Sequence, residues 1–132
     1  MGDVTGPQRR TRQRTAVTRV LAGRPEFRTA QEIHELLLTL GAPVGLATVY
    51  RTLQSLAEAG DVDVIRTPAG QSAYRDCSRS PQHHHHLVCR SCGASLEVSF
   101  DAVEGALGEL AARHGFRDVL HEVTLFGLCA RC

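Results

Sequence analysis

Two pairs of cysteines, each with the spacing C-x-x-C, constrain the fold of this chain more than any other feature. They are Cys89 with Cys92 and Cys129 with Cys132, and 36 residues lie between the pairs. Each pair can place two thiolates on one ion, and the four together complete a tetrahedral zinc site with no open position for chemistry. Such a site would tie the two ends of a C-terminal subdomain together. A redox dithiol is the alternative for either pair taken alone.

The cysteine count and the hydropathy of the chain favour a reducing environment. Five cysteines are an odd number, which argues against a complete disulfide framework. The N-terminus is polar, and no apolar segment approaches the ~20 residues needed to span a bilayer. We therefore expect a cytoplasmic protein with no membrane partner, whose paired cysteines bind metal rather than each other.

Four consecutive histidines lie just before the first cysteine pair, and the apolar Leu-Val that follows them favours a β-strand. Side chains in a strand alternate between its two faces. His83 and His85 would therefore point to one side, and His84 and His86 to the other. One short segment could then serve two separate metal sites, whereas the alternative is a run of solvent-exposed polar residues.

Each pair of histidines needs further ligands, and both halves of the chain offer candidates. Cys77 is the one cysteine outside the two C-x-x-C pairs, and it lies at the expected hinge between the halves. Asp63 lies on an expected strand. Glu104 and His121 lie between the two cysteine pairs. Their ordinary alternatives are a buried inert thiol for Cys77, a surface carboxylate for Asp63 and a packed side chain for His121. Glu104 has capping-box spacing from Asp101, so it could instead cap a helix.

The helix expected near Glu104 has an apolar face, which we predict to be buried. Its members are Val103, Leu107, Leu110 and Ala111. A strand-like run over residues 119–125 follows this helix and contains His121.

The first half of the chain has the apolar periodicity of three helices followed by a hairpin. The helices are expected over residues 11–21, 29–40 and 46–59, and the strands over residues 62–64 and 73–75. Thr29 and Glu32 have capping-box spacing. The second helix carries a core-facing stripe, formed by Ile33, Leu36, Leu37 and Leu40. This order of elements predicts a winged helix-turn-helix, whose third helix enters the major groove of DNA.

The outward face of the third helix carries groups that can contact phosphates and base edges, namely Thr48, Tyr50, Arg51, Thr52 and Ser55. The N-terminal segment adds a cluster of arginines, namely Arg9, Arg10, Arg12, Arg14 and Arg19. Guanidinium groups pair with phosphates in a forked geometry, so this cluster suits a polyanion. An ordinary polar helix face and a solvated basic tail are the alternatives. Because the element order and the charge agree, we expect double-stranded DNA as the partner.

Several of these features together resemble the ferric uptake regulator family. They are the segment Gly45-Leu-Ala-Thr-Val-Tyr-Arg-Thr-Leu53, the histidine run before Cys89, and the closing cysteine pair. The resemblance extends from about Thr11 to Cys132 and is greatest to the zinc-sensing branch found in actinobacteria. It implies an α+β fold and a homodimer, with a winged-helix DNA-binding domain over residues 1–78 and a small αβ dimerisation domain over residues 79–132. It also implies a transcription regulator rather than an enzyme.

The resemblance further implies three zinc sites. The structural site would consist of Cys89, Cys92, Cys129 and Cys132. The sensing site at the hinge would consist of Asp63, Cys77, His84 and His86. A second regulatory site would consist of His83, His85, Glu104 and His121. We therefore expect two to three zinc ions per chain, one structural and one or two regulatory. Tyr50 and Arg51 match base-reading positions of the family, and N-terminal arginines such as Arg12 and Arg14 match its backbone contacts.

The ligand types favour zinc over iron, because one thiolate, two imidazoles and one carboxylate form a four-coordinate and partly soft set. Cys77 decides this prediction, and His85 supports it, since iron-sensing relatives commonly carry Asp there. We thus expect a zinc-dependent repressor of zinc-uptake genes, in which zinc at the hinge fixes the dimer geometry on a palindromic operator. A regulator that responds to iron, manganese or peroxide is the alternative within the family. A zinc hydrolase or deaminase is the alternative outside it, but the chain lacks the H-x-E motif of deaminases, and we expect no small-molecule substrate.

Overall fold

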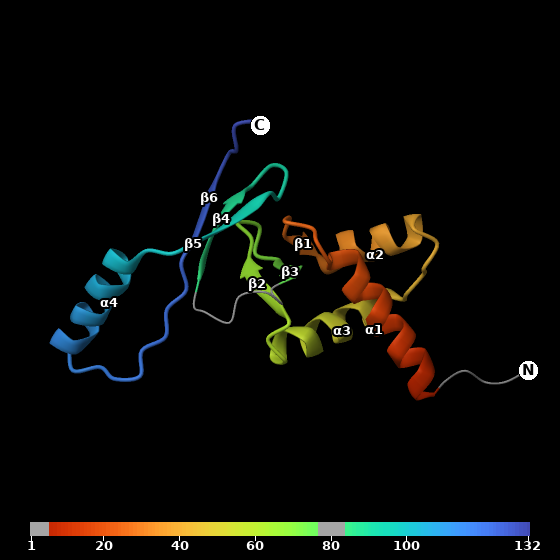
Figure 1. The fold of residues 1–132 in the computed structure, drawn as a ribbon, viewed down its shortest axis with the longest axis horizontal. Coiled ribbons are helices and arrows are strands. Elements are labelled where there is room, and N and C mark those ends of the chain that lie inside the picture. Colours follow the sequence, from red (N-terminus) through yellow and green to blue (C-terminus); the bar gives the residue numbers. More distant parts are fainter. Residues whose placement is uncertain (1–5, 77–83) are drawn as a thin grey trace, which may run out of the picture.

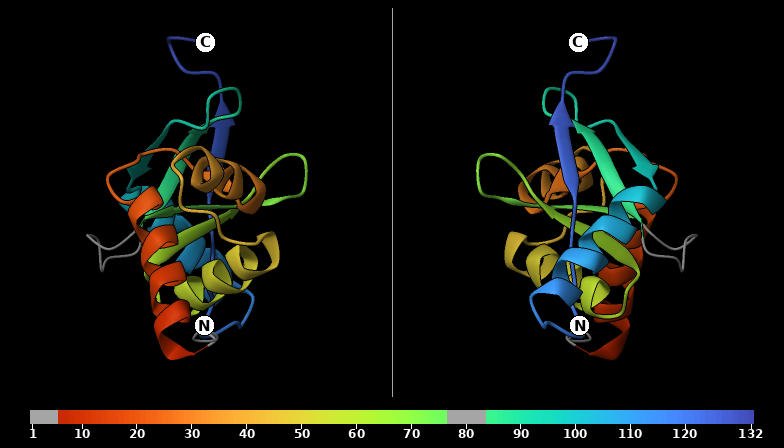
Figure 2. Two further views of the ribbon diagram at one scale, coloured as in Figure 1. Left: turned by 90° about the vertical axis from the view of Figure 1, so that its right-hand side faces the viewer. Right: turned by 90° about the vertical axis from the view of Figure 1, so that its left-hand side faces the viewer.

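The computed structural model describes residues 6–76 and 84–132. Three helices and a small sheet form the first half, at the right of Figure 1. Its elements are α1 (Pro7–Leu21), β1 (Arg28–Thr29), α2 (Ala30–Thr39), α3 (Leu46–Glu58), β2 (Val62–Arg66) and β3 (Ser72–Asp76). The sheet has the order β1-β3-β2 with antiparallel pairs, and the β2–β3 turn projects from the body in Figure 2. The predicted winged helix is therefore confirmed.

Local sequence signals explain where the helices begin and end. The Thr29 hydroxyl accepts a hydrogen bond from the Glu32 N–H, and the Glu32 carboxylate accepts one from the Thr29 N–H, so the predicted capping box is confirmed. Helix α1 begins at Pro7, four residues before the predicted start, because the fixed φ of proline suits the first turn. Helix α3 ends at Glu58, just before Gly60 turns the chain with a φ of 78°.

The helices enclose one apolar core, and its most buried members come from all three: Val17, Ile33, Leu37, Val49 and Leu53. The prediction that Leu40 belongs to this stripe is wrong, because its side chain is 60% exposed. Helix α2 ends at Thr39, and Leu40 occupies the C-cap position, where the chain turns away from the core.

The second half is a three-stranded sheet with one helix, and its elements are β4 (His85–Cys89), β5 (Ser95–Val98), α4 (Asp101–Arg113) and β6 (Thr124–Gly127). The order is β5-β4-β6, with β4 and β5 antiparallel and β4 and β6 parallel. Helix α4 lies in the connection from β5 to β6 and stands at the far left of Figure 1, away from α1, α2 and α3. The predicted combination of a winged helix with a small C-terminal αβ part is confirmed.

Two predictions for this half are wrong. Helix α4 has no buried residues, and Val103 and Leu110 are 42% and 49% exposed, because none of the residues that the structure describes covers this face. The strand predicted over residues 119–125 begins only at Thr124, since β4 offers hydrogen-bonding partners from His86 to Cys89 only.

The two halves meet through a loop of the first and a turn of the second. The Phe27 N–H donates to the Gly93 carbonyl at 3.2 Å, and the Ser95 hydroxyl donates to the Pro25 carbonyl. A small apolar cluster lies beneath these contacts, formed by Phe27, Ile65, Ala73 and Val88 with Phe126 against it. The predicted domain boundary between residues 78 and 79 lies outside the described residues. None of the described helices has the length and apolar character to cross a bilayer.

Candidate metal centres and nucleic-acid interface

Four cysteines meet at one end of the second sheet, and we call Cys89, Cys92, Cys129 and Cys132 the cysteine cluster. The parallel pairing of β4 with β6 sets Cys89 opposite Gly127, which brings the two C-x-x-C pairs to the same end of the sheet. The Cys92 and Cys129 sulfurs are 3.8 Å apart, those of Cys129 and Cys132 are 3.5 Å apart, and all four lie within 4.8 Å of one another. Sulfurs around a tetrahedral zinc ion are about 3.8 Å apart. The geometry therefore fits a four-thiolate zinc site.

Hydrogen bonds prepare part of the cysteine cluster for ionisation. Backbone N–H groups of Cys92 and Cys129 lower the pKa of the Cys89 thiol to about 6. The Cys129 nitrogen lies 3.4 Å from the Cys89 sulfur. The backbone at Arg131 likewise lowers the pKa of Cys129. At Cys132 a hydrogen bond with Ser91 lowers the pKa, but the three neighbouring thiols outweigh it and raise the pKa to about 11. The Cys89 thiolate thus forms readily and the Cys132 thiolate does not, because each thiolate makes the ionisation of its neighbours less favourable.

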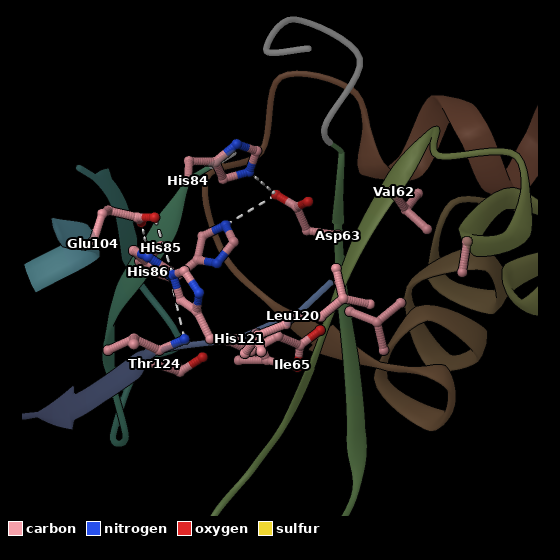
Figure 3. Close-up of a pocket in the computed structure, with 15 residues that line it drawn as sticks. Val62, Asp63, Ile65, His84, His85, His86, Glu104, Leu120, His121 and Thr124 are labelled. Atoms are coloured by element: carbon pink, nitrogen blue, oxygen red, sulfur yellow. Dashed lines mark hydrogen bonds and ion pairs between the residues drawn. The ribbon is translucent and has the colours of Figure 1, made fainter. Parts of the chain in front are cut away.

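A second group lies between the two halves of the molecule, and we call Asp63, His84, His86 and Glu97 the hinge cluster. Figure 3 shows Asp63 on the wing strand β2, facing the imidazoles of His84, which directly precedes β4, and of His86, which lies in β4. Asp63 Oδ2 is 2.8 Å from His84 Nε2 and 2.9 Å from His86 Nε2. One ligand atom from each of the four residues lies within 4.8 Å of the others. A cation here would contact both halves at once.

The prediction for this site and the structure differ in two members. Cys77 lies outside the described residues, so its expected place in the hinge cluster stays a prediction. Glu97 was missed, although it lies directly opposite His86 across the β4–β5 pair. The alternating side-chain directions of β5 place Glu97 on one face of that strand, but the residue opposite it is known only once the strand register is known.

A third group lies toward helix α4, and we call His85, Glu104 and His121 the α4 cluster. His85 is buried, and its Nε2 is 2.6 Å from Glu104 Oε1, while His121 Nε2 is 3.1 Å from Glu104 Oε2. The predicted alternation thus separates His85 from His84 and His86, and His83 lies outside the described residues. Glu104 is not a cap, because Phe100 is the N-cap residue and no side chain caps the helix.

A hydrogen bond to the other ring nitrogen of His85 bears on metal binding at this cluster. The Val123 N–H donates to His85 Nδ1 at 3.3 Å, so the proton of a neutral ring lies on Nε2, toward Glu104. Histidine ligands usually donate the proton of their second nitrogen to a neighbouring acceptor. Coordination through Nε2 therefore requires this hydrogen bond to rearrange. The α4 cluster and three members of the hinge cluster, Asp63, His84 and His86, line one cavity of about 650 Å³ between β2 and residues 119–124 (Figure 3).

A groove of about 560 Å³ between α1 and α3 gathers most of the predicted DNA contacts. It is lined by Arg9, Arg10, Arg14, Thr48, Arg51, Thr52 and Ser55, among others. Arg14 Nη1 donates to Ser55 Oγ at 2.9 Å, and Arg51 Nη2 donates to Thr48 Oγ1 at 3.3 Å. Tyr50 is half exposed. Arg12 lies apart from these residues, because it lines a separate groove between α1 and the end of α2.

A winged helix with a basic groove, joined to a second half that carries three groups of metal-ligating side chains, defines a metal-responsive transcription regulator. The chain belongs to the Ferric uptake regulator family, whose sequence profile matches residues 7–126. The prediction of a regulator rather than an enzyme is therefore confirmed.

The relatives within this family include zinc regulators. The zinc uptake regulation protein of Mycobacterium tuberculosis is 51% identical over 124 residues, which are 94% of each chain. The crystal structure of FurB from M. tuberculosis, described as a zinc uptake regulator, shares 50% identity, covers 96% of this chain and 97% of its own, and superposes with a TM-score of 0.58. A zinc uptake regulator complexed with zinc and DNA shares 31% identity over 91% of this chain and 80% of its own, with a TM-score of 0.69.

Proposed function

We propose that this protein is a zinc-dependent repressor of zinc-uptake genes, which binds a palindromic operator as a homodimer. The observation that carries the proposal is the position of Asp63. This carboxylate of the wing lies within 3 Å of two imidazoles from the second half, so ligands for one ion come from both halves. The names of the relatives favour zinc as that ion.

The donor set of the hinge cluster supports zinc as well. Two imidazole nitrogens and a carboxylate oxygen are ligands that zinc accepts in four-coordinate sites, and Cys77 would supply the fourth as a thiolate. Bound zinc would act as an electrostatic tie between these groups. Asp63 would then remain next to His84 and His86, rather than separating from them when the halves move.

Holding the hinge in one arrangement controls DNA binding because of the dimer. The wing and the recognition helix α3 belong to one body, packed through Val49, Leu53 and Leu56. Fixing Asp63 against the second half fixes the direction of α3 relative to the dimer axis. Two α3 helices must reach half-sites about 34 Å apart, or a multiple of that distance, to bind together. Contact between metal and DNA is not needed.

The second half would form the dimer. Several of its large apolar side chains lie open to solvent in the single chain, and a group of such side chains is typical of a surface that a partner covers. They include Val103, Leu110, Phe116, Leu120 and Leu125. A second copy of the chain that packs on α4 and β6 would cover this surface.

We propose that the cysteine cluster holds a structural zinc ion and that the α4 cluster is a second regulatory site with His83. The total would then be two to three zinc ions per chain. Because the Val123 N–H occupies His85 Nδ1, the α4 cluster should fill after the hinge cluster. Arg14, Thr48, Tyr50 and Arg51 would contact the operator through the groove of α1 and α3. Arg12 would reach phosphates only outside that groove.

The test is elemental analysis of zinc per chain, before and after mild dialysis against a chelator, with operator binding followed in parallel. We expect zinc to fall to one ion per chain, with operator binding lost and then restored by added zinc. Asp63→Asn should keep one zinc ion and a folded dimer but lose the zinc-dependent binding. Glu58→Gln, an exposed change at the end of α3, is the matched control. Operator binding that ignores both the chelator and Asp63→Asn would contradict the proposal.

A further inference from the structure

An arginine lies beside the hinge cluster, although a cation opposes the binding of a divalent metal. Arg75 on β3 lies directly opposite Asp63 on β2, and Glu97 on β5 lies directly opposite His86 on β4. Residues directly opposite each other in an antiparallel pair share one face of the sheet. The wing therefore presents Asp63 and Arg75 side by side, and the second half presents His86 and Glu97 side by side.

Arg75 and Glu97 form an ion pair across the boundary between the halves. Arg75 Nη1 is 3.6 Å from Glu97 Oε1, and the two side chains are 16% and 33% exposed. Arg75 Nε and Nη1 are buried and have no hydrogen-bond partner within residues 6–76 and 84–132. A buried guanidinium is costly without a counterion, so the position of the Glu97 carboxylate next to it is favoured.

The two carboxylates of the hinge cluster share His84 as a partner but lie at different distances from it. Asp63 Oδ2 lies 2.8 Å from His84 Nε2, whereas Glu97 Oε1 is 4.0 Å from the same nitrogen. Asp63 faces the imidazoles, and Glu97 faces the guanidinium. Both carboxylates are near enough to serve one ion, but Glu97 would have to leave Arg75 to do so.

We propose that Arg75 determines the metal specificity of the hinge site by keeping Glu97 out of the coordination sphere. The inference rests on the proposed function, since it takes the hinge cluster to be a metal site. With Glu97 held by Arg75, the described ligands are two imidazoles and one carboxylate, a small set that suits tetrahedral zinc. A second carboxylate would add oxygen donors and raise the coordination number, which suits manganese and other ions that prefer octahedral oxygen-rich sites.

Cobalt(II) provides the direct test, because its visible absorption distinguishes tetrahedral from higher coordination. The full-length protein would carry zinc in the cysteine cluster and His121→Ala throughout, so that the α4 cluster does not contribute. We expect an intense tetrahedral spectrum with Arg75 and a weak, higher-coordinate spectrum with Arg75→Gln. The affinity for manganese relative to zinc should rise about tenfold or more in Arg75→Gln, the scale on which groups behind metal ligands act.

Three further variants separate this role from a merely structural one. Arg75→Lys retains a cation for Glu97 and should keep the tetrahedral spectrum. Glu97→Gln alone should keep the tetrahedral spectrum, because Glu97 is not a ligand while Arg75 is present. The double change of Arg75→Gln with Glu97→Gln should restore the tetrahedral spectrum. Each variant should retain one zinc ion in the cysteine cluster as a check of folding.

Two results would overturn the inference while leaving the proposed function intact. One is a cobalt spectrum that changes in Glu97→Gln, which would make Glu97 a ligand. The other is an Arg75→Gln protein with an unchanged spectrum and an unchanged ratio of manganese to zinc affinity. If the protein with Arg75 unchanged bound no metal other than the zinc ion of the cysteine cluster, the proposed sensing function would itself be wrong, and this inference with it.

Discussion

The ring of Phe27 meets the imidazole of His86 edge to face, with the ring centroids 4.9 Å apart and the planes at 88°. The same residue donates its backbone N–H to Gly93, which directly follows Cys92. Gly93 has a φ of 79°, and a Cβ there would lie 3.0 Å from the Phe27 carbonyl oxygen, so only glycine suits this approach. One residue of the winged helix thus contacts both the hinge cluster and the turn of the cysteine cluster.

Replacing Phe27 by Ala should therefore weaken both the fold and the hinge site. Removing a buried phenylalanine costs about 3–5 kcal/mol of unfolding free energy, and His86 would lose the ring that orients it. We expect zinc affinity at the hinge to fall about tenfold or more, with the zinc ion of the cysteine cluster retained. Denaturant unfolding and zinc titration measure the two effects. Leu38→Ala, at an exposed position of α2, is the control and should leave zinc affinity unchanged.

Cys132→Ser should remove the zinc ion of the cysteine cluster, because three thiolates cannot complete its tetrahedral shell. The turn at Gly93 and Ser95 depends on that cluster, so the contact with Pro25 and Phe27 should loosen as well. We expect one zinc ion fewer per chain and a lower melting temperature. Arg131→Ala, at the exposed neighbouring position, should change neither. Full zinc content in Cys132→Ser would show that this residue is not a ligand.

Two of the arginines that line the α1–α3 groove, Arg14 and Arg51, should contact different parts of the DNA. Arg51→Ala should cost about 1–3 kcal/mol on the cognate operator if the side chain contacts a base edge. Arg14→Ala should weaken binding uniformly across sequences and lower the salt dependence by about one counterion, as expected for a phosphate contact. Binding assays on cognate and random DNA at several salt concentrations measure both. An equal loss on both DNAs would assign Arg51 to phosphate contact instead.

The cysteine cluster should ionise in steps when it holds no metal. Because backbone N–H groups lower the pKa of Cys89 from 9.0 to about 6, its thiolate favours the folded state. That contribution is complete above pH 9 and is lost as the pH falls through about 6. In zinc-free protein, ultraviolet thiolate absorbance should show a first step near pH 6 that is absent in Cys89→Ser. A first step near the ordinary thiol pKa in both proteins would contradict this ordering.

The elements of this fold with strong local signals could be predicted from the sequence. The capping box of Thr29 and Glu32, the stripe of α2 and the Pro-Gly turns fix helices and a hairpin through contacts within a few residues. The errors concern Leu40, helix α4 and the run over residues 119–123. In each case the pattern is apolar, but where a helix ends, how far a strand pairs and what covers a helix face depend on contacts outside the segment, which periodicity does not contain.

The candidate sites divide in the same way. The sequence by itself determined the four cysteines and the division of the histidines, because C-x-x-C spacing and the two-residue alternation of a strand are local properties. The family resemblance implied that Asp63 joins His84 and His86, but only the tertiary structure placed its carboxylate 2.8 and 2.9 Å from their rings and brought Arg75 and Glu97 beside them. The physical reason is register: cross-strand neighbours such as Asp63 with Arg75, and His86 with Glu97, are set by how strands pair and how the two halves pack.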